Sequence, residues 1–165
     1  MSWSLFKTKC AVLTGPQHIS ETQFAQTIAD AYHSAVSLHF DSMTAGGKLI
    51  NNAPKLPILQ QQIQMWCSMN RTTSQDVDFL KQIGPAFIQY WTLLSIIGPT
   101  GSVIVTSPGV WNNIRVTQNF DFQIILNALI LSCRVHLTTL TGIYTSSVIP
   151  GVTAPWNGTM FQSLP

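Results

Sequence analysis

Apolar side chains recur at helical spacing in four stretches of the chain. In the first stretch they predict an amphipathic helix over about residues 21–42. The apolar positions of this helix are Phe24, Ile28, Ala31, Ala35 and Leu38. Ser20 and Gln23 have the residue types and spacing of a capping box, in which each side chain accepts a hydrogen bond from the backbone N–H of the other residue. This pair places the start of the helix at Glu21.

Three further helices follow from the same periodicity. The second has its apolar positions at Leu56, Leu59, Ile63 and Trp66, and glutamines occupy much of its remaining surface. The third is expected to begin near Thr73 or Ser74, and Gly84-Pro85 should kink or split it because proline removes a backbone hydrogen bond. The fourth is predicted from residue 119 or 120 to Leu140, with an apolar arc wide enough for a central helix.

Two segments lack helical periodicity. Residues 98–117 place turn-forming residues around a short β-branched run, which predicts a long loop that could hold a strand or a small hairpin. Residues 146–165 contain three prolines and predict an extended arm, which would pack either on its own domain or on a neighbour. We therefore predict a mainly α fold, with about four helices in one domain over residues 1–145 and an extended C-terminal arm over residues 146–165.

The surface of this chain must be unusually poor in charge. Charged residues make up 8% of the sequence, apolar residues 45%, and the net charge is +2, whereas soluble domains carry about 25% charged residues. Serine, threonine, asparagine and glutamine must cover most of the surface, and such neutral groups pair across an interface without the cost of burying ions. Copies of such a chain also repel one another little. We therefore expect self-association or a large protein partner.

The charge and hydropathy patterns count against two other classes of partner. Lysine and arginine are scattered, so the chain lacks the basic face that binds nucleic acid. The two most apolar runs, residues 86–97 and 124–131, are shorter than the roughly 20 residues of a membrane span. The N-terminus has no apolar stretch typical of a secretory signal. We expect neither a nucleic-acid partner nor an integral membrane protein.

The sequence motifs predict no catalytic, cofactor or metal site. The serine-hydrolase, phosphate-loop and dinucleotide-binding patterns are all missing. Cys10, Cys67 and Cys133 are far apart in the sequence and predict buried, reduced thiols. The one pair that could carry chemistry is Cys133 with His136, which share a helix face at i, i+3. A metal bound there would need further ligands from elsewhere in the fold.

Bulky side chains in the segments without predicted helices are the candidate partner contacts. They are Trp3, Trp111, Trp156, Met160 and Phe161. Aromatic residues are enriched at the centres of protein interfaces, but tryptophans in loops also commonly fold back onto their own domain. The sequence leaves both arrangements open.

Two segments carry a family resemblance. They are MSWSLFKTK (residues 1–9) and HLTTLTGIY (residues 136–144), which is followed by a tail containing proline and glycine. Both resemble small virion structural proteins of tailed bacteriophages, especially contractile-tailed ones. The resemblance implies a tail, baseplate or neck component that is present in symmetric copies and has no catalytic residues. It also implies assembly in the host cytoplasm and a final location in the virion. Residues 48–118 carry no such resemblance.

The leading hypothesis is therefore a non-enzymatic virion structural protein that contacts copies of itself and other virion structural proteins, with no cofactor. A holin-like, membrane-active protein is the first alternative, because the chain is poor in charge and has an apolar run at residues 86–97. The second alternative is a small enzyme or metal-binding domain that uses Cys133 and His136.

Overall fold

Ser20 and Gln23 cap the longest helix of the structure, as their spacing predicts. The backbone N–H of Gln23 donates to Ser20 Oγ (3.2 Å), and the backbone N–H of Ser20 donates to Gln23 Oε1 (3.1 Å). The helix α2 (Glu21–Met43) therefore begins at the predicted residue.

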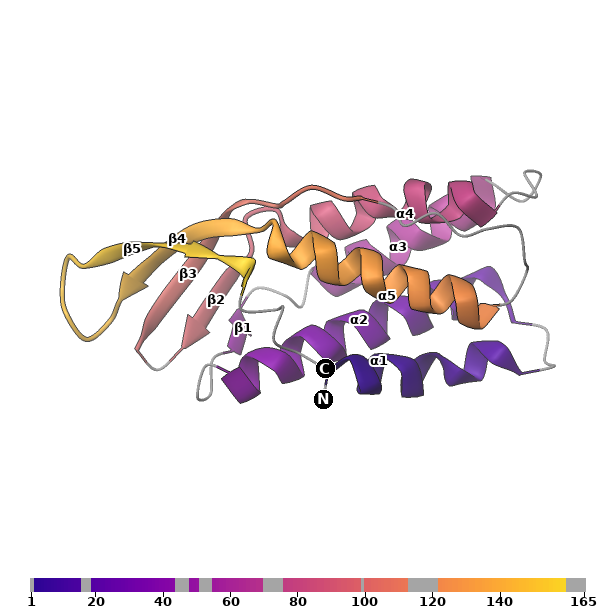
Figure 1. Cartoon of the computed structure of the whole chain (residues 1–165), viewed down its shortest axis with the longest axis horizontal. Helices are drawn as coiled ribbons and strands as arrows, with labels where there is room; N and C mark the ends of the chain where they lie inside the picture. Colours follow the sequence, from indigo (N-terminus) through magenta and orange to yellow (C-terminus); the bar gives the residue numbers. More distant parts are fainter. Residues whose placement is uncertain are drawn as a thin grey trace.

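This computed structural model describes residues 2–15, 19–43, 48–50, 55–69, 76–98, 100–112 and 122–159. The helices other than α2 are α1 (Ser2–Cys10), the short 3-10 helix η1 (Ala11–Thr14), α3 (Lys55–Met69), α4 (Asp76–Trp91) and α5 (Phe122–Thr138). Figure 1 shows the five α-helices gathered in one bundle. In the bundle α2 contacts both α1 and α3, and α4 contacts both α3 and α5. The sequence pattern predicted four of these helices and missed α1.

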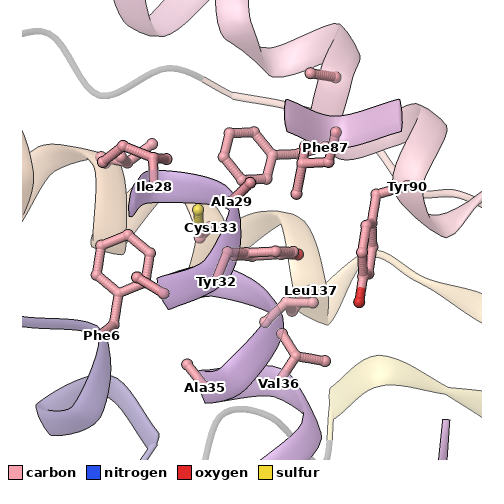
Figure 2. Packing of buried hydrophobic residues seen from close by; sticks show 14 of the residues in the cluster. Phe6, Ile28, Ala29, Tyr32, Ala35, Val36, Phe87, Tyr90, Cys133 and Leu137 are labelled. Carbon is pink, nitrogen blue, oxygen red and sulfur yellow. The ribbon is translucent and has the colours of Figure 1, made fainter. Parts of the chain in front are cut away.

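Tyr32 of α2 lies at the centre of the bundle core. Its side chain is fully buried, and its hydroxyl accepts a hydrogen bond from the indole N–H of Trp91 (2.7 Å). Its ring packs edge-on against Phe87 (4.8 Å between ring centroids) and Tyr90 (5.4 Å) of α4. Figure 2 shows Tyr32 between Phe6 of α1 and Tyr90 of α4. A buried tyrosine hydroxyl needs such a partner, because an unmatched polar group in the core is costly.

Five strands form a single antiparallel sheet in the described part of the chain. They are β1 (Lys48–Ile50), β2 (Ser95–Gly98), β3 (Gly101–Ser107), β4 (Thr141–Ser146) and β5 (Thr153–Asn157), and their order in the sheet is the order in the sequence. Figure 1 shows that β2 to β5 project from one end of the helix bundle. Ile96, Val103 and Val105 join the sheet to the bundle, because their side chains belong to the hydrophobic core.

The prediction of a mainly α fold is wrong, because the protein is an α+β protein. The sheet was missed because apolar residues occur on both of its faces. Val103, Ile104 and Val105 are consecutive in β3, although Ile104 is exposed and its two neighbours are buried. A strand with one polar face alternates visibly in sequence, whereas this one gives a continuous apolar run. Residues 95–97 likewise ended the apolar run 86–97, although they belong to β2.

The two segments without helical periodicity contribute two whole strands, β3 and β5, to the sheet. Gly98 of the predicted loop ends β2 and residues 101–107 form β3, so the hairpin that this loop could hold begins three residues earlier, at Ser95. Residues 153–157 of the expected C-terminal arm form β5, which pairs with β4 of the same chain. Gly84-Pro85 does not split the helix, since α4 continues through Pro85.

Leu93 lies in the turn between α4 and β2 with a left-handed backbone (φ 54°), and its side chain is 74% exposed. This conformation costs a residue with a Cβ roughly 1–2 kcal/mol. We expect Leu93→Gly to raise the free energy of unfolding by about 1 kcal/mol, measured by urea denaturation. Leu93→Ala keeps the Cβ and is the matched control. If the alanine variant gains as much as the glycine variant, relief of the backbone is not the cause.

Candidate interaction surface

The glutamine-rich side of α3 is used inside the bundle. Gln60 Nε2 donates to Asp30 Oδ1 (3.0 Å), and Gln64 Nε2 donates to the Thr22 hydroxyl (2.9 Å), both on α2. Gln62 bonds to Gln89 of α4. These amides connect α3 to both neighbouring helices. They therefore supply hydrogen bonds within the chain, where the sequence suggested a surface for partners.

Trp111 folds back onto the bundle. Its indole ring stacks on Phe87 of α4 (5.1 Å between centroids, 6° between planes), and its N–H donates to the carbonyl oxygen of Leu80 (2.9 Å). The ring lies against Gly84, where an added Cβ would overlap it. Gly84 therefore provides the seat for Trp111, a role that its place beside a proline in the sequence did not indicate.

His136 is a completely buried residue of α5 and lies beside Trp111. One ring nitrogen, Nε2, is 2.7 Å from the carbonyl oxygen of Pro108, so it must carry the hydrogen and donate it. The other, Nδ1, has no hydrogen-bond partner among the described residues. Burial lowers the pKa of His136 from 6.5 to about 4, although the bond to Pro108 opposes this shift. The imidazole is therefore neutral at pH 7.

Cys133 lies one turn before His136 and is also completely buried. Burial raises the pKa of Cys133 well above 9, and the nearby thiol of Cys10 adds a smaller rise. A thiolate–imidazolium pair needs the opposite shifts, with a lowered thiol pKa and a raised imidazole pKa. Burial likewise raises the pKa of Cys10 to about 12 and that of Cys67 to about 11. These thiols are poor nucleophiles in this environment.

His33 is a partly buried histidine of α2. Its Nδ1 lies 2.8 Å from the hydroxyl of Tyr90, which is almost fully buried. Burial lowers the pKa of His33, and the carboxylate of Asp30 partly opposes the shift. Within the part of the chain that the structure describes, His, Cys, Asp and Glu side chains form no group of three or more that could hold a metal ion.

The tryptophans among the candidate partner contacts pack within this chain. Trp3 is buried in the core beside Phe6, at 5.9 Å between ring centroids. Trp111 occupies the seat on α4, and Trp156 of β5 is half-buried against Gly142 of β4. Met160 and Phe161 lie outside the described residues.

Three exposed apolar residues that sequence reasoning missed lie on the sheet. We call the side of β2 to β5 that faces away from the core the outer face. Ile104 of β3 lies opposite Ile143 of β4, which lies opposite Pro155 of β5, so the three form a row across neighbouring strands. The side chains of Ile104 and Ile143 are 50% and 49% exposed, and Ile97 of β2 is 42% exposed. The positions beside them on this face are serine, threonine and asparagine.

A second group of exposed apolar residues forms the tip of the hairpin between β4 and β5. Val148, Ile149 and Val152 are 68%, 58% and 43% exposed. Ile149 to Val152 make a type II turn, in which the backbone N–H of Val152 donates to the Ile149 carbonyl (3.3 Å) and Gly151 has φ 79°. Ser146 Oγ also accepts bonds from the N–H groups of Val148 and Ile149. The sequence signal for this tip was Pro150-Gly151 between two apolar segments.

Pro155 lies at the open edge of the sheet. Gly158 N–H donates to Leu140 O, and Ser146 N–H donates to Val152 O (both 2.9 Å). Hydrogen-bonded pairs alternate along an antiparallel ladder, so Ile143 and Pro155 form a pair whose backbone groups point away from each other. The nitrogen of Pro155 therefore faces the open edge, where it has no hydrogen to donate. An additional strand would miss a central hydrogen bond at this position.

The outer face and the hairpin tip contain no formal charge. Residues 82–114 and 135–165 include no Asp, Glu, Lys or Arg, and these ranges contain β2 to β5. The one charged residue in the five strands, Lys48, is on β1 opposite Ile97. The site is thus an apolar and hydroxyl-rich surface on the projecting strands.

Comparisons with known proteins add no relative of this chain. No protein-family model matches it, and no curated protein or solved structure shows significant similarity to it. Among the described residues, each helix is too short or too polar to traverse a lipid bilayer.

Proposed function

We propose that this chain is a non-enzymatic structural subunit of a particle, of the kind found in the virion of a tailed bacteriophage. The observation that carries the proposal is the ordered apolar hairpin tip on an uncharged, projecting sheet. An exposed apolar group of this kind favours aggregation in an isolated protein, and it becomes useful when a neighbouring subunit covers it. Apolar side chains that enter a hollow of a partner contribute most of the binding energy at many interfaces.

The buried ionisable groups also support a structural role. His136 and Cys133 are both neutral and lie inside the bundle, where they contribute to packing and to one hydrogen bond. An acid–base catalyst needs a titrating group within reach of a substrate. The structure gives no such access to these two side chains, since both are completely buried.

The resemblance to phage virion proteins indicates which kind of subunit we propose. Residues 2–9 lie in α1, and residues 136–144 run from the end of α5 into β4. The subunit would thus be a tail, baseplate or neck component, with copies of itself and other virion structural proteins as neighbours. It would be assembled in the host cytoplasm and retained in the virion.

Replacement of the hairpin tip tests this proposal. In cells that produce the particle, a tagged wild-type chain should sediment with particles in a density gradient. Val148→Ser combined with Ile149→Ser should lower the amount in the particle fraction at least 10-fold, because apolar anchors at an interface are worth roughly 2 kcal/mol or more each. The turn should survive, since Ser146 Oγ bonds to backbone groups only.

Leu131→Ser on α5 is the matched control, because this leucine is similarly exposed (45%) but lies far from the tip in the sequence. It should be incorporated as well as the wild type. A wild-type chain that stays in the soluble fraction or enters the membrane fraction would contradict the structural role. Deletion of residues 146–165 is a poor test, because it removes β5 and destabilises the sheet.

A further inference from the structure

We infer that the outer face of the sheet pairs with the outer face of a second copy of this chain in a two-fold, face-to-face contact. The inference rests on the proposed function, since it assigns a partner to one surface of the subunit. The row of Ile104, Ile143 and Pro155 would form the centre of the contact, because β3 and β4 are the inner strands of the projecting part of the sheet.

The absence of charge favours an identical partner. In a two-fold contact the same surface meets itself, so a charged group near the axis approaches a group of the same sign. The outer face of β2 to β5 carries none. Its serine and threonine hydroxyls are both donors and acceptors, so they can pair with the same groups of the other copy. Self-contact therefore has no electrostatic penalty on this face.

The absence of charge on the outer face also disfavours a membrane as its partner. Peripheral binding to a cell membrane is strengthened by lysine and arginine near anionic headgroups, and β2 to β5 have neither residue. A partner that adds a strand beside β5 would meet Pro155, which leaves one hydrogen bond unmade. The outer face carries no comparable obstacle to pairing.

The dimensions of the face predict a weak and reversible dimer. Four strands spaced by about 4.8 Å, with roughly 20 Å of length in β4, give a flat area of about 400 Å². Specific interfaces bury roughly 800 Å² of accessible surface on each partner. Protruding side chains make the accessible area of the face larger than its flat area. The area of the contact still lies at the lower end of the range for specific interfaces. For a contact of this size we expect a dissociation constant in the micromolar range.

Sedimentation equilibrium of the purified full-length protein is the first measurement. The wild type should dimerise at micromolar concentration. Ile143→Lys should weaken the dimer at least 10-fold, and so should Ile143→Glu, because each places like charges together near the two-fold axis. Ile104→Thr retains strand propensity and should weaken it less. Circular dichroism checks that each variant is folded, and the tip variant Val148→Ser with Ile149→Ser should dimerise like the wild type.

Mixing the two charged variants provides the decisive step. An equimolar mixture of Ile143→Lys and Ile143→Glu should restore dimers, because opposite charges then meet across the same contact. Dimers that persist unchanged in both variants, or no recovery in the mixture, overturn the face pairing. A wild type that stays monomeric up to about 100-fold above the expected constant, or that binds neutral phosphatidylcholine vesicles through this face, also overturns it. The particle sedimentation described above does not depend on any of these results, so the two proposals can fail separately.

Discussion

Gly84→Ala should destabilise the protein by about 2 kcal/mol, although the same substitution in an open helix stabilises by roughly 1 kcal/mol. The added Cβ would overlap the ring of Trp111, which must then leave its seat on α4. The ring would lose its stacking on Phe87 and its bond to Leu80, together with part of its burial. These losses amount to roughly 3 kcal/mol, which exceeds the gain in helix propensity. Chemical denaturation followed by circular dichroism measures the difference.

A double-mutant cycle separates the contact between Trp111 and position 84 from the effect of alanine on helix propensity. In a Trp111→Ala background the position beside Gly84 is empty, so Gly84→Ala should become stabilising by about 1 kcal/mol. The change of sign is the diagnostic result, since it requires that the two residues touch. If alanine at position 84 has the same effect in both backgrounds, Trp111 does not occupy this seat in solution.

Acidification from pH 6.5 to pH 4 should lower the free energy of unfolding by about 3 kcal/mol through His136 alone. The pKa of the buried imidazole is about 4, whereas the unfolded side chain titrates near 6.5. Between these values the unfolded state binds a proton that the folded state does not, so protonation favours unfolding. The loss of stability begins as the pH falls below about 6.5 and is complete once the pH is below about 4.

His136→Gln removes the titrating imidazole and is the variant to compare with the wild type. Its amide can still donate to the Pro108 carbonyl, so the variant should fold, with a shallower loss of stability between pH 6.5 and pH 4 in urea titrations. His33→Gln is the control. Burial also lowers the pKa of His33, but this residue is only partly buried, and its removal should flatten the curve less. Equal slopes for the wild type and His136→Gln would show that His136 is not buried in the neutral form.

The sequence predicted those parts of the fold that rest on local periodicity and caps. Ser20 and Gln23 marked the start of α2, and the stripes of α3, α4 and α5 agree with the structure because each buries one face against a neighbour. The sheet could not be predicted in this way. Its strands are three to seven residues long, and Ile104 and Ile143 interrupt the expected alternation by placing apolar side chains on the exposed face.

The candidate contacts were predicted less well than the helices, for a related reason. Trp111 attracted attention as a large aromatic residue in a loop, but the space above Gly84 exists only once α4 and the following segment are folded. The exposed residues Val148 and Ile149 were assigned to an extended arm, although Pro150-Gly151 indicates a turn. Residue type alone does not reveal which side chains the tertiary structure leaves exposed.

Pro155 sets a limit on how this sheet can grow. An open sheet edge is a template for pairing with another chain, and head-to-tail edge pairing has no final size and leads to fibres. Face-to-face pairing ends after two copies, because each face is then covered. A proline at the middle of β5 therefore works against open-ended growth from this edge of the sheet. Such a limit would suit the subunit of a larger assembly that we propose above.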